Sequence, residues 1–138
     1  MKNVEEKNQS GYVILVNAIN KHTSSSSVIG FCTDLEDAEY IFKNIKFKTF
    51  QVNGEYVYFL QYLPVVGKIG DNVTIVYIGD QKHTIYRPIY GYDSYKAAEE
   101  KCKEIKDNTD YLCAVEYIEK LTKEWADKFK QPPEYSWN

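Results

Sequence analysis

The chain has 138 residues, a length that fits one domain or two very small ones. Hydrophobic residues make up 43% and charged residues 27%, a composition that excludes a disordered or fibrous protein. The formal net charge of −3 argues against nucleic-acid binding driven by bulk charge, and no apolar run approaches the roughly 18 residues that a membrane-spanning helix needs.

Residues 1–10 are mostly polar and contain no apolar signal-peptide segment, so we expect a flexible N-terminal arm. The three cysteines, Cys32, Cys102 and Cys113, show no CxxC spacing, and only two histidines accompany them. This set of ligands is too small for a structural zinc site, and we expect no metal and no cofactor. Without a leader, the sequence predicts a cytoplasmic protein with reduced thiols.

Short blocks of sequence recur in the same order along the chain. Lys21-His22-Thr23 returns 61 residues later as Lys82-His83-Thr84, and a glycine follows each histidine by eight residues. At an offset of 60, five further residues are identical: Ala38, Glu39, Lys43, Ile45 and Lys46 match Ala98, Glu99, Lys103, Ile105 and Lys106. This self-similarity predicts an internal duplication, with repeats at residues 11–63 and 73–118.

The first repeat is expected to contain strands at 11–19 and 28–32, then a helix, then a closing strand at 55–63. Thr33 and Glu36 have the spacing of a capping box, which predicts where the helix begins. The apolar stripe of this helix consists of Leu35, Ala38, Ile41, Phe42 and Ile45.

The second repeat is expected to contain strands at 73–79 and 85–92, a helix capped by Asp93 or Ser94, and a closing strand at 110–118. The stripe of its helix consists of Tyr95, Ala98, Cys102 and Ile105. Residues 64–70 link the repeats. A third helix is predicted from about Thr122 within the C-terminal segment 119–138, burying Leu121, Trp125 and Phe129 and ending at Pro132.

These elements predict an α+β fold. A hairpin followed by a helix and a returning strand gives an antiparallel three-stranded sheet with its third strand beside the first, and with the helix on one face. One such unit is marginally stable by itself. We therefore expect residues 1–138 to form a single compact domain of two pseudo-symmetric repeats plus a C-terminal helix.

The two histidines are the first candidates for a functional site, because the pseudo-symmetry offers a way to bring them together. His22-Thr23-Ser24 and His83-Thr84-Ile85 resemble the paired His-x-Ser/Thr motifs of the 2H phosphoesterase family. The second triplet departs from that pattern at Ile85, and the polar neighbours place both histidines on hairpin turns. The alternative that we favour is that both are exposed turn histidines.

Arg87 is the second candidate, because it is the only arginine in the chain and lies in a tyrosine-rich strand. With Tyr86 and Tyr90, it is suited to stacking on a ring and binding a phosphate. The candidate ligand-binding residues are therefore His22, His83, Tyr86, Arg87 and Tyr90. The carboxylates form no convincing catalytic set, so we predict no catalytic residue.

Two functional hypotheses follow. In the first, the chain is a small non-enzymatic protein that binds another protein, and its abundance of Lys, Asn, Ile and Tyr points to a phage- or virus-encoded modulator of host machinery. In the second, a small anionic ligand or nucleotide binds at the junction of the repeats, to be sequestered or, as the phosphoesterase resemblance implies, hydrolysed. Homodimer formation stays open, and no membrane association is expected.

Overall fold

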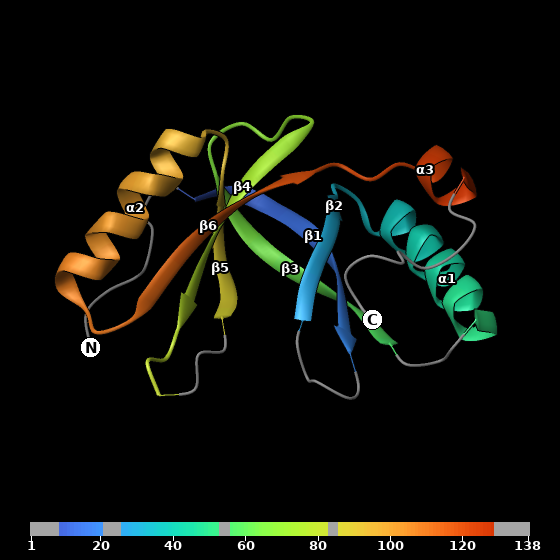
Figure 1. The fold of residues 1–138 in the computed structure, drawn as a ribbon. Coiled ribbons are helices and arrows are strands. Elements are labelled where there is room, and N and C mark those ends of the chain that lie inside the picture. Colours follow the sequence, from blue (N-terminus) through green and yellow to red (C-terminus); the bar gives the residue numbers. More distant parts are fainter. Residues whose placement is uncertain (1–8, 21–25, 53–55, 83–85, 129–138) are drawn as a thin grey trace. The chain divides into compact units, whose positions relative to one another are not determined.

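The computed structural model describes residues 9–20, 26–52, 56–82 and 86–128 (Figure 1). In chain order, the elements are β1 (Gln9–Asn20), β2 (Ser26–Cys32), α1 (Leu35–Val52), β3 (Tyr56–Val66), β4 (Asn72–Gly79), β5 (Tyr86–Tyr92), α2 (Tyr95–Asn108), β6 (Leu112–Glu119) and α3 (Lys123–Lys128). The predicted α+β class and the predicted order of elements are confirmed.

Hydrogen bonds connect the strands in the order β2-β1-β3-β5-β4-β6. As predicted, β3 neighbours β1, and β6 neighbours β4. The prediction of a purely antiparallel sheet is wrong, because β3 and β5 pair in parallel through Val65–Gly91 and Val66–Tyr92. The sheet is therefore mixed. Its parallel pair arises because β3 continues to Val66, three residues beyond the predicted end of the strand.

The described residues belong to two compact units, which we call the β1–β3 unit and the β4–β6 unit. The β1–β3 unit lies within residues 13–62 and 120–138, and the β4–β6 unit within residues 1–12 and 63–119. Each unit has its own helix and its own hydrophobic cluster.

In the β1–β3 unit, α1 and α3 pack with β1, β2 and β3 around one cluster of apolar side chains. Its buried members are Ile14, Val16, Ala18, Cys32, Ala38, Ile41, Ile45, Tyr58, Leu121 and Ala126. The predicted stripe of α1 is therefore correct at Ala38, Ile41 and Ile45, whereas Leu35 is 45% exposed. Leu35 is the first residue of the helix, where the stripe has not yet reached the cluster.

Asp34 rather than Thr33 caps α1, since the Asp37 N–H donates a hydrogen bond of 2.8 Å to Asp34 Oδ1. Thr122 caps α3 in the same way, accepting a hydrogen bond of 3.0 Å from the Trp125 N–H. The start of the third helix was therefore predicted to within one residue, and its predicted continuation to Phe129 and Pro132 lies outside the described residues.

Cys32 gives the β1–β3 unit a predictable response to alkali. Its side chain is buried, and burial, with smaller contributions from Asp37 and Asp34, raises the thiol pKa from 9.0 to about 11. Between these values the unfolded chain loses a proton that the folded chain keeps, so the free energy of unfolding falls as pH rises. We expect this thiol to contribute a slope of about −1.4 kcal/mol per pH unit in that interval.

Urea denaturation of the wild type, Cys32→Ala and Thr33→Ala between pH 8 and 11 measures this slope. The stability difference between the wild type and Cys32→Ala should shrink above pH 9, whereas the difference for the non-titrating neighbour Thr33 should stay constant. A constant difference for Cys32→Ala would show that the thiol titrates alike in both states.

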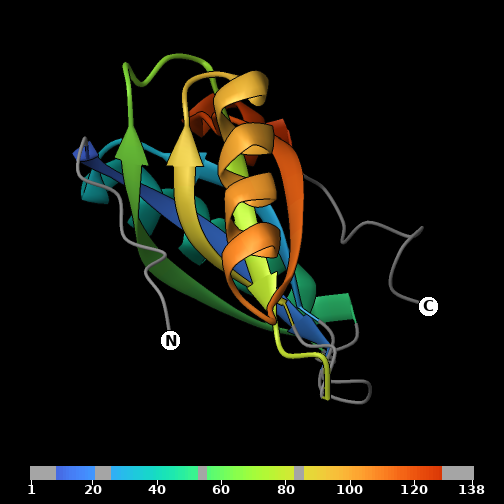
Figure 2. The same cartoon turned by 90° about the vertical axis from the view of Figure 1, so that its left-hand side faces the viewer.

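In the β4–β6 unit, β4 pairs antiparallel with β5 on one side and with β6 on the other. Helix α2 contacts all three strands and covers one face of them (Figure 2). Ser94 caps α2 by accepting a hydrogen bond of 3.0 Å from the Ala97 N–H, which settles the predicted choice between Asp93 and Ser94. The cluster beneath α2 consists of Val76, Ile78, Tyr92, Ala98, Cys102, Ile105 and Cys113.

The β3–β4 connection is shorter than the predicted linker. Gly67, the residue after β3, has a φ of +99°, a left-handed conformation that favours glycine. The Asp93 N–H donates to the Val66 carbonyl (3.2 Å), and Asp93 Oδ2 accepts from the Lys68 N–H (3.1 Å). These bonds tie the start of the connection to the end of β5.

The two hairpins have equivalent registers. Each of the six residue pairs of the β1–β2 ladder has a counterpart 60 positions later in the β4–β5 ladder, starting with Ile14–Cys32 and Thr74–Tyr92. Both ladders also shift by one residue at the equivalent place. The offset of 61 that aligned the hairpins in the sequence therefore differs from the structural correspondence, in which Gly91 takes the place of Phe31.

Candidate functional site

Two of the five predicted site residues, His22 and His83, lie outside the described residues. The other three lie on β5. Tyr86 pairs with Gly79 at the start of the strand, and Arg87 pairs with Ile78. Ile78 belongs to the cluster beneath α2, so its cross-strand neighbour Arg87 is on the α2 face.

Neighbouring residues of a strand point to opposite faces, so Tyr86 and Arg87 diverge. Tyr90 is half-buried against the α2 cluster, whereas Tyr86 is 40% exposed. The structure therefore does not bring the Tyr86 ring beside the Arg87 guanidinium in the way that a ring-and-phosphate site requires.

Within residues 9–20, 26–52, 56–82 and 86–128, no group of three or more His, Cys, Asp or Glu side chains is arranged to hold a metal ion. None of the helices in this part of the chain is both long and apolar enough to cross a membrane.

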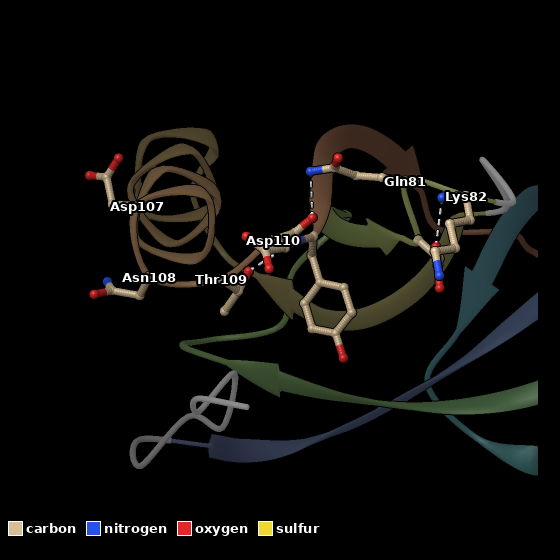
Figure 3. Close-up of a pocket in the computed structure, with 8 residues that line it drawn as sticks. Gln81, Lys82, Asp107, Asn108, Thr109 and Asp110 are labelled. Carbon is tan, nitrogen blue, oxygen red and sulfur yellow. Dashed lines mark hydrogen bonds between the residues drawn. The ribbon is translucent and has the colours of Figure 1, made fainter.

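The β4–β6 unit contains a pocket of about 900 Å³ at one end of the sheet (Figure 3). It lies between the turn that follows β4 and the connection from α2 to β6. The residues that line it are Asp80, Gln81, Lys82, Asp107, Asn108, Thr109, Asp110 and Tyr111. The sequence showed these two segments only as polar turns, and no motif distinguished them from other turns.

Local hydrogen bonds hold both sides of this pocket. The Gln81 side-chain amide donates to the Asp110 carbonyl (2.7 Å), and Asp80 Oδ1 accepts from the Lys82 N–H (2.7 Å). Figure 3 shows Asp107 and Asn108 pointing away from Gln81 and Lys82. The polar groups therefore do not converge on one reacting centre, as general acid–base catalysis requires.

The charge of the pocket also bears on its ligand. Three carboxylates and one ammonium group line it, from Asp80, Asp107, Asp110 and Lys82. This lining favours a small cation and disfavours the anionic ligand or nucleotide predicted from the sequence. The pocket lies within one unit, whereas the predicted ligand site was placed at the junction of the repeats.

A second hollow of about 330 Å³ lies between α2 and β6 in the same unit. It is lined by Glu99, Cys102, Lys103, Lys106, Asp107, Cys113, Ala114 and Val115. The two thiols lie together there: burial and a hydrogen bond with Cys102 raise the pKa of Cys113, which makes it a poor nucleophile. Both cysteines are free, so this hollow is suited to contact rather than to thiolate chemistry.

The strand beside this hollow is the last one in the strand order. Of the described strands, β6 neighbours only β4. Cys113 and Val115 pair with Ile78 and Val76 of the α2 cluster, so alternate residues of β6 lie on the α2 face. Tyr117 continues this row and is 53% exposed.

Tyr95, the first residue of α2, is 49% exposed. We use the name α2–β6 surface for Tyr95, Glu99, Lys103 and Lys106 of α2 with Ala114, Val115 and Tyr117 of β6. It combines exposed aromatic rings, charged side chains and a strand edge.

Comparison of the chain with protein-family models, with curated proteins and with solved structures finds no significant match. The function is therefore inferred from the geometry of the chain's own residues.

Proposed function

We propose that the chain is a small non-enzymatic binding protein whose α2–β6 surface engages another polypeptide. The observation that carries this proposal is the position of β6 at the end of the strand order, with Tyr117 half-exposed beside the hollow under α2. An edge strand offers backbone N–H and C=O groups to an added strand, and a neighbouring hollow accepts alternate side chains of that strand.

The side chains of the α2–β6 surface fit this mode of binding. Tyrosine supplies a large contact area at a small cost in side-chain entropy and is enriched in protein interfaces. Tyr95 and Tyr117 are each about half exposed, so both retain apolar area for a partner to bury. Lys103 and Lys106 lie at the rim, where exposed charges contribute to specificity more than to affinity.

Two parts of this proposal concern origin. The equivalent registers of the two hairpins, 60 residues apart, support the hypothesis that the chain arose by internal duplication. The composition, with 13 tyrosines in 138 residues and one arginine, supports a phage- or virus-encoded protein that modulates host machinery from the cytoplasm.

A random-peptide library selected on the folded protein tests the proposal. A selected peptide, titrated into isotope-labelled protein, should shift amide resonances along β6 and the facing side of α2. Tyr117→Ala should weaken its binding at least about tenfold, as truncation of an interface tyrosine commonly does.

Tyr86→Ala is the matched control, since Tyr86 is also exposed but lies at the opposite end of the β4–β5 ladder. Equal binding by the two tyrosine variants would contradict the proposal. Resonance shifts confined to 80–82 and 107–111, caused by a small cation rather than by a peptide, would favour the second candidate, a small-ligand site in the 900 Å³ pocket.

A further inference from the structure

We infer that the polypeptide accepted by the α2–β6 surface is a second copy of this chain, paired antiparallel along β6. This inference rests on the proposed function, because it names the partner of the same surface. It is carried by three features of the β4–β6 unit: the residue pattern of β6, the position of α2 and the distribution of charge along α2.

The residue pattern of β6 is complementary to itself. A two-fold axis through Ala114 places Cys113 opposite Val115 of the second copy, and Tyr111 opposite its Tyr117. All four residues lie on the α2 face, because they alternate with Ala114 along the strand. Cross-strand aromatic and apolar pairs of this kind stabilise antiparallel sheets.

The opposite face of β6 also permits this pairing. Ala114, which is exposed, meets its own counterpart there, and its small side chain leaves room for the close approach of two strands. The flanking pairs are Leu112 with Glu116, and Asp110 with Ile118. No two like charges are opposite each other in this register, so the pairing brings no direct repulsion.

The position of α2 gives the two helices a normal packing distance. Helix α2 contacts both β4 and β6. Adjacent strands lie about 4.8 Å apart, so helices centred over the β4–β6 gap of each copy would be about 10 Å apart. Packed helices are about 8–10 Å apart, so the second α2 would close the hollow that now separates α2 from the strand edge.

The charges along α2 match this arrangement. On the side that faces the hollow, Glu99 comes first and Lys103 and Lys106 follow. Ala114 is the middle one of the three β6 residues in the hollow, and Cys102 and Lys103 are the middle ones of the α2 residues. The same two-fold axis therefore sets Glu99 of one copy against Lys106 of the other, twice in the dimer.

Sedimentation velocity over a range of concentrations tests the inference on the full chain. The wild type should show a reversible monomer–dimer equilibrium. Ala114→Arg places two guanidinium groups at the two-fold axis and should weaken dimerisation at least about tenfold. Ser27→Arg is the matched control, since Ser27 is an exposed small residue on β2, the strand at the other end of the strand order, and should not change the equilibrium.

Two further variants test the register. Lys103→Glu with Lys106→Glu should weaken the dimer, and addition of Glu99→Lys should restore it by reversing the charge pairs. Ala114→Cys should form a disulfide-linked dimer on mild oxidation, since opposite residues in antiparallel strands have Cα atoms about 4.5–5.5 Å apart, within disulfide range. Ser27→Cys should not.

A wild type that remains monomeric at every concentration would overturn the inference, and so would a dimer that survives Ala114→Arg. If the monomeric wild type still binds selected peptides through Tyr117, the proposed function stands and only the identity of the partner is wrong. If it binds no peptide either, both fail.

Discussion

Gly91→Ala is expected to lower the free energy of unfolding by about 1–3 kcal/mol, the usual cost of forcing an extra methyl group into a packed interior. Gly91 lies on β5 between two neighbouring strands, opposite Val65 of β3 and Ile75 of β4. A methyl group at this position would lie 2.6 Å from Val73 Cγ1 and 3.2 Å from Val65 Cγ2. Carbon atoms in favourable contact are about 3.5–4.0 Å apart, so one of these side chains must move.

Neither valine has free space to move into, because Val73 and Val65 are 1% and 0% exposed. The cost therefore arises from the packing around β5 and not from the backbone of Gly91. Val73→Ala in the Gly91→Ala background should recover part of the loss, since it removes the atom in closest contact.

Urea denaturation of Gly91→Ala beside Gly70→Ala measures the effect. An added methyl group at Gly70 would meet no atom within 4 Å, so Gly70→Ala should change the stability by less than about 0.5 kcal/mol. Equal stabilities of the two variants would show that β5 can relax around the added methyl group.

The helices were predictable because their signals are local. Ala38, Ile41 and Ile45 recur at helical spacing, and each is fully buried in the structure. The capping box at Thr33 failed because Asp34, one position later, offers a carboxylate that can accept the same kind of bond. Two adjacent capping residues produce nearly the same sequence signal, and only the backbone geometry distinguishes them.

The parallel β3–β5 pair was not predictable from local pattern. The predicted linker began at residue 64, but Val65 and Val66 continue β3 and pair with β5. The proline at position 64 favoured a strand end, since proline lacks the N–H that a ladder requires. Pairing with a strand that comes 20 residues later overrode that preference.

The candidate site was harder to predict than the fold. The sequence emphasised chemically distinctive residues, Arg87 among them, but strand alternation separates Arg87 from Tyr86. The α2–β6 surface depends instead on which strand ends the sheet, and edge position is a property of the strand order. Exposed Tyr117 has no local signal that distinguishes it from buried Tyr92.

Ile45→Ala and Ile105→Ala are expected to destabilise the protein by similar amounts, about 2–5 kcal/mol each. The two residues lie 60 positions apart on α1 and α2 and are 0% and 1% exposed. Each packs into the cluster of its own unit, beneath the helix that carries it. Truncation removes the same three carbon atoms from each cluster, so equivalent packing implies equivalent cost.

Glu39→Ala and Glu99→Ala are the matched control, because these residues are also 60 positions apart but are exposed on the same helices. Each should change the stability by less than about 0.5 kcal/mol in urea denaturation. A loss below about 1 kcal/mol for one isoleucine, with the full loss for the other, would mean that the two units share an order of elements without sharing a way of packing. Similar losses would extend the equivalence of the hairpin ladders to the helices, as descent from one duplicated unit requires.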